Sequence, residues 1–155
     1  MRSLSALATA LLIATACSDP AELDDRWEDP ERIEFAASLD VDLATMTLTP
    51  SGLFWKELQP GEGDTAQVGA QIRLRSVVWL PDGSRVGEEI GQFPLGMGLA
   101  IRGIDEGAVG MRVGGIRQLV VRPSLAWGRA GLPTGGIPPL STLVIELERL
   151  TSLAQ

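Results

Sequence analysis

The chain has 155 residues, enough for one ordinary domain with short additional segments, and its 45% hydrophobic and 21% charged residues are typical of a globular protein. It contains no histidine and no tyrosine, which excludes a Ser/His triad, a Cys/His pair and a histidine-bearing metal site. Without these sites, chemistry must come from carboxylates, the backbone or the shape of a cavity. The net charge of −7, with no basic face to offset it, argues against nucleic acid as a partner.

Residues 1–17 predict an export signal. Arg2 precedes the apolar run LSALATALLIATA, which is too short to span a bilayer comfortably and ends at Cys17. Cys17 is the only cysteine, so no internal disulfide can form, and its position resembles that of the lipidated cysteine in bacterial lipoprotein signals. Ala14 stands where that signal usually has leucine, and an ordinary secretory signal is the alternative. We therefore expect an exported protein with a lipid anchor at Cys17, held on a bacterial membrane in the periplasm or outer envelope.

Residues 18–50 differ in composition from the rest. They hold ten acidic side chains against Arg26 and Arg32, a balance of −8, and all 18 glycines lie after residue 51. Both shifts place a boundary near residue 50, with one domain over 51–151. The acidic segment is interpreted as a solvated linker, with a disordered tail as the alternative. Within it, DPERIEFAASL predicts one short helix, with Asp29 as N-cap and Pro30 at the first helical position.

Alternating hydrophobicity predicts several strands after residue 51. GLFWKEL (52–58) is followed by the turn PGEGD, and QIRLRSVVWL (71–80) places Ile72, Leu74, Ser76, Val78 and Leu80 on one face. PDG at 81–83 closes a hairpin, and a short return strand follows over 84–88. FPLG comes next at 93–96.

From residue 99 the spacing of the apolar residues changes to that of a helix. Ala100, Ile101, Ile104 and Ala108 predict one short amphipathic helix over 99–108, on which Asp105 and Glu106 are expected to be solvated. IRQLVVRP (116–123) and TLVIELERL (142–150) predict two further strands. On the last strand Leu143, Ile145 and Leu147 should face inward, with Val144, Glu146 and Glu148 on the opposite face. The fold class expected is α+β, an antiparallel half-barrel sheet wrapped around one short helix.

A long loop, 127–141, separates these two strands. It contains WGRAGLPTGGIPPLS, in which prolines limit chain freedom and glycines permit close backbone approach. Long ordered loops in compact domains are usually functional, and a large ring such as Trp127 in a glycine-rich loop favours a binding wall over simple packing.

Several spaced motifs in one order resemble FKBP-type peptidyl-prolyl isomerases. The strongest are AIRGIDEGAVGMRVGG, similar to the family's helix, and AWGRAG, IPP and LVIELERL after it; the resemblance covers nearly all of residues 52–150. It implies an FKBP-like fold, catalysis of cis/trans rotation at X-Pro bonds, and proline-containing polypeptides as substrates. It implies no cofactor and no metal.

The resemblance also implies site residues. Ile101 matches the residue whose backbone N–H binds a substrate carbonyl, and Trp127 matches an aromatic wall that is commonly tyrosine. These two are the expected catalytic residues. The expected substrate pocket consists of Val86, Phe93, Ala100, Ile104, Leu132, Ile137 and Ile145.

Three positions depart from the family pattern. Ser76 replaces a typical tyrosine, while Val86 and Gly87 replace a typical Phe-Asp pair, so each lost ring is expected to weaken substrate binding by about 1–2 kcal/mol. Two functions therefore stay open at this point. One is a prolyl isomerase that assists the folding of exported proteins. The other is a weak or inactive FKBP-like chaperone or binding module of the cell envelope.

Overall fold

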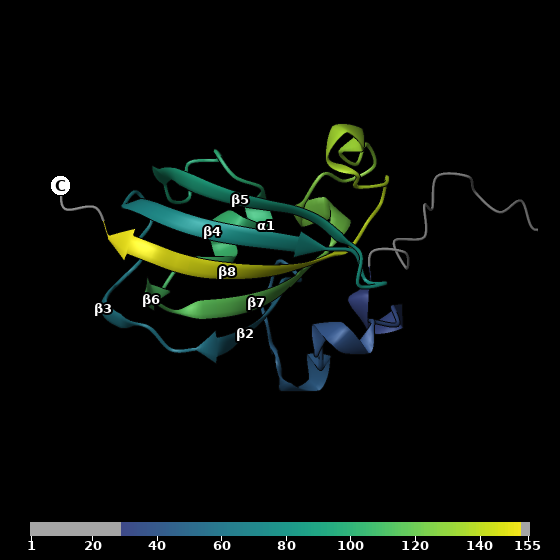
Figure 1. Cartoon of the computed structure of the whole chain (residues 1–155), viewed down its shortest axis with the longest axis horizontal. Coiled ribbons are helices and arrows are strands. Elements are labelled where there is room, and N and C mark those ends of the chain that lie inside the picture. The colour runs from purple at the N-terminus through teal and green to yellow at the C-terminus, as the bar shows by residue number, and fades with distance from the viewer. Residues whose placement is uncertain (1–28, 153–155) are drawn as a thin grey trace, which may run out of the picture.

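The protein is described by a computed structural model over residues 29–152, so Cys17 and the export signal predicted for 1–17 lie outside the described residues. An antiparallel sheet of six strands, in the order β1-β2-β7-β8-β4-β5, curves around the short helix α1 (Arg102–Gly107) (Figure 1). This confirms the expected α+β half-barrel. The six strands are β1 (Thr47–Leu48), β2 (Phe54–Gln59), β4 (Gln71–Trp79), β5 (Arg85–Pro94), β7 (Ile116–Val121) and β8 (Leu143–Ser152). A separate pair is formed by β3 (Glu62–Thr65) and β6 (Arg112–Val113).

The main core lies between the concave face of the sheet and α1. Period-2 alternation selects its residues: Ile72 and Leu74 come from β4, and Ile145 and Leu147 come from β8, all nearly or fully buried. β8 lies between β7 and β4 in the sheet, with Ile145 paired to Leu119 on one side and to Val78 on the other. The prediction that Leu143, Ile145 and Leu147 face inward is confirmed.

Two glycines let α1 approach β7 closely. A Cβ at Gly103 would lie 2.5 Å from a methyl carbon of Val121, and one at Gly107 would lie 2.5 Å from a methyl carbon of Leu119. Any larger residue would push the helix off the sheet. The spacing of four residues puts both glycines on the face of α1 that meets β7.

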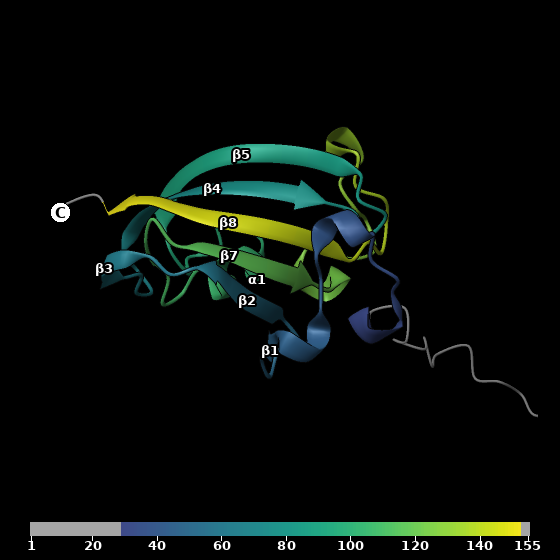
Figure 2. The same cartoon turned by 60° about the horizontal axis from the view of Figure 1, so that its bottom comes forward.

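The described part of the acidic segment packs on the outer face of the sheet. It forms three 3-10 turns in place of the one helix predicted, namely η2 (Pro30–Arg32), η3 (Ala37–Leu39) and η4 (Leu43–Thr45) (Figure 2). Asp29 does cap the first turn, because its carboxylate accepts a hydrogen bond from the N–H of Glu31 at 3.0 Å. After Arg32 the chain turns extended, with Ile33 at ψ 132.

Apolar side chains explain this course. Leu39 and Met46 are buried against Phe54, Val120 and Val144 on the outer face of β2, β7 and β8. The side-chain amide of Gln118 also donates to the carbonyl of Leu39 at 2.7 Å. Residues 29–48 are therefore a strap bound to the sheet and not a solvated spacer. The strap also buries Val144, which the alternation of its strand had placed opposite the core. A domain boundary at residue 50 stays a prediction.

Element lengths differ from the sequence-based expectation at two places near the pocket. The return strand expected over 84–88 continues as β5 to Pro94, because β5 pairs with β4 along its whole length, and a proline is tolerated at the end of an edge strand. The helix expected over 99–108 is reduced to 102–107, since Ile101 has extended geometry (ψ 149) and serves as the N-cap. The short strands β1, β3 and β6 were not predicted.

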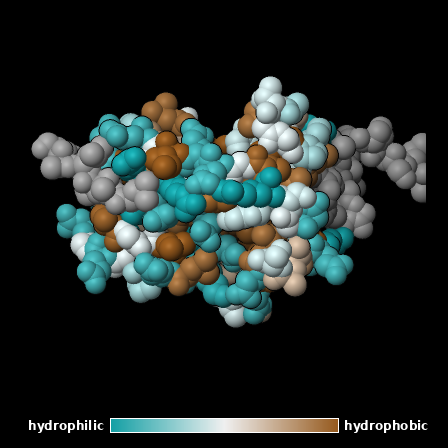
Figure 3. Space-filling view, in the orientation of Figure 1, coloured by the Kyte–Doolittle hydropathy of each residue, from teal (hydrophilic) through white to brown (hydrophobic). Residues whose placement is uncertain are grey.

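Hydrophilic side chains cross the middle of the outer sheet face, as the space-filling view shows (Figure 3). Part of this band is an ion-pair cluster in which Arg75 contacts Glu88 at 2.6 Å and Glu148 at 3.3 Å. The hydrogen bond from Arg75 holds the pKa of Glu88 below its usual value. None of the helices described within residues 29–152 has the length and hydropathy needed to cross a membrane.

Candidate functional site

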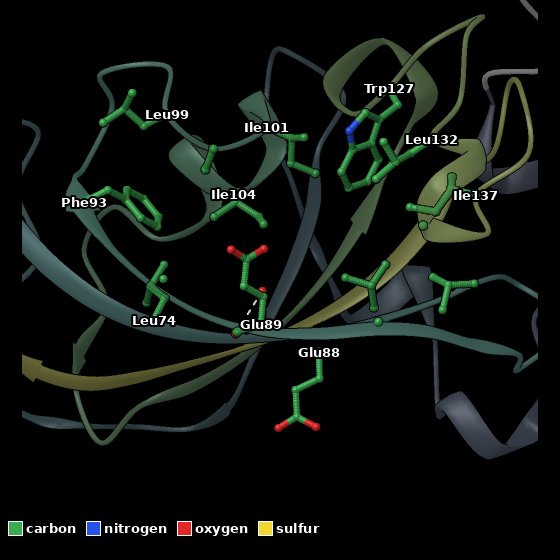
Figure 4. A pocket seen from close by; sticks show the side chains of 17 residues that line it. Leu74, Glu88, Glu89, Phe93, Leu99, Ile101, Ile104, Trp127, Leu132 and Ile137 are labelled. Atoms are coloured by element: carbon green, nitrogen blue, oxygen red, sulfur yellow. Dashed lines mark hydrogen bonds between the residues drawn. The ribbon is translucent and has the colours of Figure 1, made fainter.

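A cavity of about 480 Å³ opens between the concave face of β4 and β5, the N-terminal end of α1 and the loop that follows β7. Trp127, Leu132 and Ile137 line the end formed by the loop, whereas Leu74 and Phe93 line the other end (Figure 4). Ile101 and Ile104 lie between them. The lining is mostly apolar, as expected for a site that binds an apolar segment of a ligand.

Hydrogen bonds within the loop 127–141 fix the wall that carries Trp127. Leu132 and Ile137 exchange two backbone hydrogen bonds, of 2.9 and 3.0 Å. Gly131 has φ +63, and a Cβ there would lie 2.5 Å from the carbonyl oxygen of Ile137, so this turn requires glycine. The 3-10 turn η6 (Pro133–Gly135) connects the two bridged residues. The proline and glycine residues of the loop therefore shape a closed, internally bonded wall.

The segment that leads into α1 is held by Asp105. Its carboxylate accepts hydrogen bonds from the backbone N–H groups of Gly96 at 3.0 Å and Gly98 at 2.9 Å. Glu106 accepts from the hydroxyl of Ser51 at 2.7 and 2.8 Å. The expectation that Asp105 and Glu106 form a solvated face is therefore wrong. Both carboxylates are structural anchors, because each accepts hydrogen bonds from residues outside α1.

The C-terminal end of α1 is held by Arg117, which is 5% exposed. Its guanidinium donates to the carbonyls of Gly107 at 2.7 Å and Val109 at 3.0 Å, and it lies 4.1 Å from the ring centroid of Trp55. Burial lowers the pKa of Arg117, an effect that the nearby Glu57 opposes. Anchors at both ends therefore fix the position of α1, and with it Ile101 and Ile104.

The wall formed by β4 and β5 has few large side chains. Ser76 and Gly87 stand at the middle of this wall, and a Cβ at Gly87 would meet no atom within 4 Å. Val86 lines the cavity beside them, and Phe93 supplies the one aromatic ring of β5. The cavity is consequently open on this side, at the three positions that depart from the family pattern.

The structure brings together all but one of the residues predicted for the site. Ile145 is the exception. It is fully buried in the core beneath the cavity, because Val78 and Leu119 flank it on the neighbouring strands. The other predicted residues all line the cavity: Ile101, Trp127, Val86, Phe93, Ala100, Ile104, Leu132 and Ile137.

The sequence analysis missed seven lining residues: Leu74, Val78, Glu88, Glu89, Gly91, Leu99 and Gly135. Leu74 and Val78 share their face of β4 with Ser76, so the alternation of that strand could have identified them. Glu89 was hidden because β5 was expected to end at residue 88. Once β5 is extended, the same alternation places Glu89 on the inward face together with Phe93.

The comparisons with known proteins all indicate the same family. The sequence profile described as "FKBP-type peptidyl-prolyl cis-trans isomerase" matches residues 57–150. The FK506-binding protein of Neisseria meningitidis serogroup B is 36% identical over 104 residues, which cover 64% of this chain and 94% of that protein. FK506-binding protein 4 of Mycosarcoma maydis is 39% identical over 109 residues, 67% of this chain but only 28% of that longer protein.

A solved structure agrees with the sequence matches. The crystal structure of AtFKBP13 superimposes with a TM-score of 0.63 at 30% identity, covering 70% of this chain and 98% of that one. The residues 57–150 matched by the family profile include β4, β5, α1 and the loop 127–141, which together enclose the cavity.

Proposed function

The chain belongs to the FKBP-type peptidyl-prolyl cis-trans isomerase family, and we propose that it catalyses cis/trans isomerisation of X-Pro bonds in exported polypeptides. The observation that carries this proposal is the apolar cavity between Ile101 and Trp127. A proline ring is an apolar group of a size that such a cavity can enclose.

The chemistry requires no nucleophile and no proton transfer. Resonance gives the peptide C–N bond a rotation barrier of about 18–20 kcal/mol, and this makes X-Pro isomerisation slow enough to limit folding. In the twisted transition state the amide loses resonance and much of its dipole. A cavity lined by Ile101, Ile104 and Trp127 therefore stabilises the twisted amide relative to the planar, more polar ground state. A chain without histidine can perform this reaction.

The backbone at Ile101 can orient the substrate. Ile101 is the N-cap of α1, and its N–H donates to no acceptor within residues 29–152. We infer that this N–H binds a substrate carbonyl, which would hold the X-Pro bond against Trp127. Orientation of this kind reduces the entropy lost on reaching the transition state.

Attachment to a membrane is a second part of the proposal. We propose that Cys17 carries a lipid and that the acidic residues after it keep the domain away from anionic lipids. A metabolic lipid label tests this. Incorporation into the wild-type chain and its loss in Cys17→Ser would support the anchor, whereas equal incorporation would contradict it.

A binding module with little or no isomerase activity is the alternative function. The open wall at Ser76 and Gly87 favours it, because less apolar area is available there to hold a twisted amide. Such a module would bind extended, proline-containing chains in the same cavity. It would bind X-Pro peptides without raising their rate of isomerisation.

A protease-free isomerisation assay on an X-Pro peptide separates these two functions. A rate above the uncatalysed rate supports the isomerase. Binding of the peptide with a rate at background would support the binding module.

A further inference from the structure

Glu89 has an acidic side chain that faces the mostly apolar cavity. On β5, the alternate residues Gly87, Glu89, Gly91 and Phe93 lie on the cavity side, where Glu89 pairs with Ser76 of β4. The carboxylate of Glu89 rises into the cavity toward Ile104 (Figure 4). At the neighbouring Gly87 a Cβ would meet no atom within 4 Å, whereas the ring of Phe93 lies against Gly91. A ligand group can therefore reach the carboxylate from the Gly87 side along the strand.

The adjacent Glu88 shows the opposite arrangement. Its side chain points away from the cavity (Figure 4), where it forms ion pairs with Arg75 and Arg85. The carboxylate of Glu89, by contrast, has no hydrogen bond or ion pair to any residue in the part of the chain that the structure describes. No basic side chain lines the cavity. Glu89 therefore gives this apolar site one uncompensated negative charge.

We propose that Glu89 makes the site selective for X-Pro segments that carry Lys or Arg within one or two residues of the proline. The inference rests on the proposed binding of X-Pro segments in this cavity. With the proline enclosed between Ile101 and Trp127, neighbouring residues of the substrate pass the open wall of β4 and β5, where Glu89 stands. A cationic side chain there is attracted to Glu89, and an acidic one is repelled.

The size of the selectivity follows from the exposure of the group. Glu89 is exposed, and attraction between exposed charges corresponds to about a twofold to fivefold change in an equilibrium constant. The preference should fall as salt is added, because the Debye length shrinks from about 10 Å at 0.1 M to about 3 Å at 1 M.

The test uses the full chain and peptides that differ only in one residue next to proline. Lys and Glu are placed either before or after the proline, and kcat/KM and Kd are measured for each peptide at low salt. The Lys/Glu ratio is the kcat/KM, or the affinity 1/Kd, of the Lys peptide divided by that of the matching Glu peptide. In the wild type we expect this ratio to be about twofold to fivefold for at least one of the two positions. It should fall toward one in Glu89→Gln and invert in Glu89→Lys.

Glu88→Gln is the matched control, because it removes the same charge one residue away on the outer face. The Lys/Glu ratio should persist in this variant. If Glu88→Gln and Glu89→Gln lower the ratio equally, the preference comes from overall charge and the inference is wrong. A wild-type ratio of one at both positions also overturns it.

Measuring both kcat/KM and Kd distinguishes a failure of this inference from a failure of the proposed function. Rates at background with a Glu89-dependent ratio in Kd would remove the isomerase and leave the selectivity. Isomerisation rates above background with a Lys/Glu ratio of one would support the isomerase and overturn the selectivity. Neither catalysis nor binding of any peptide would overturn both.

Discussion

The carboxylate of Asp105 accepts a hydrogen bond from the backbone N–H of Gly98 at 2.9 Å. This bond joins α1 to the segment that precedes Ile101, and a second bond from Gly96 strengthens the contact. The position of Ile101 in the cavity therefore depends on a side chain that does not itself line the cavity.

Replacing Asp105 should impair activity through Ile101. Asp105→Ala removes two hydrogen bonds to a charged acceptor, which stabilise a fold by about 1.5–3 kcal/mol each when shielded and by less at this partly exposed site. We expect a lower midpoint of urea unfolding and a fall in kcat/KM on an X-Pro peptide. Asp40→Asn is the control, because Asp40 is exposed with φ 47, which asparagine tolerates. Equal effects of the two substitutions would contradict a positioning role for Asp105.

Adding one methyl group to α1 should destabilise the fold. In Gly107→Ala the new Cβ would lie 2.5 Å from a methyl carbon of Leu119, so the helix or Leu119 must move. Overpacking of this kind typically costs about 1–3 kcal/mol, measurable as a reduced free energy of unfolding in urea. Gly87→Ala is the matched control, since no atom lies within 4 Å of its new Cβ. A Gly107→Ala variant as stable as Gly87→Ala would show that α1 is not packed this closely.

The strap formed by residues 29–48 should contribute to the stability of the domain. Leu39 is 8% exposed, and truncating a buried leucine to alanine typically costs about 2–5 kcal/mol. We expect Leu39→Ala to lower the unfolding free energy in urea by an amount near the lower end of this range. Leu48→Ala, at a leucine that is 53% exposed, should have little effect. If both variants unfold like the wild type, the segment is the solvated linker that its charge first indicated.

The fold was largely predictable because its signals are periodic. The alternation in β4 and β8, the helical spacing near Ile104 and the order of the motifs identified the half-barrel. The family resemblance supplied eight of the residues that line the cavity. Ile145 was misplaced because alternation identifies a face of a strand but not depth. Whether an inward residue lines a cavity or lies beneath it depends on its neighbours on other strands.

The strap and the anchors of α1 could not be predicted in the same way. The apolar residues of the segment 18–50 are scattered among ten acidic ones, so Leu39 and Met46 gave no periodic signal for packing on a sheet. Asp105 resembled a surface residue, since its partners at Gly96 and Gly98 are backbone groups that no side-chain pattern reveals. Glu89 was missed because the end of β5 was placed too early.

The central claim is that the apolar wall at Trp127 promotes twisting of the X-Pro amide. Its most direct test is the protease-free isomerisation rate of Trp127→Ala, with Trp127→Phe as a conservative variant. Trp79→Ala is a control for loss of a tryptophan elsewhere, because Trp79 packs against the buried residues beneath the strap on the outer face of the sheet. We expect kcat/KM to fall about tenfold to a hundredfold in Trp127→Ala, because the lost aromatic surface is worth about 1.5–3 kcal/mol. Trp127→Phe should recover part of that loss, and Trp79→Ala should keep a rate well above Trp127→Ala. A folded Trp127→Ala variant that isomerises the peptide as fast as the wild type would contradict the claim.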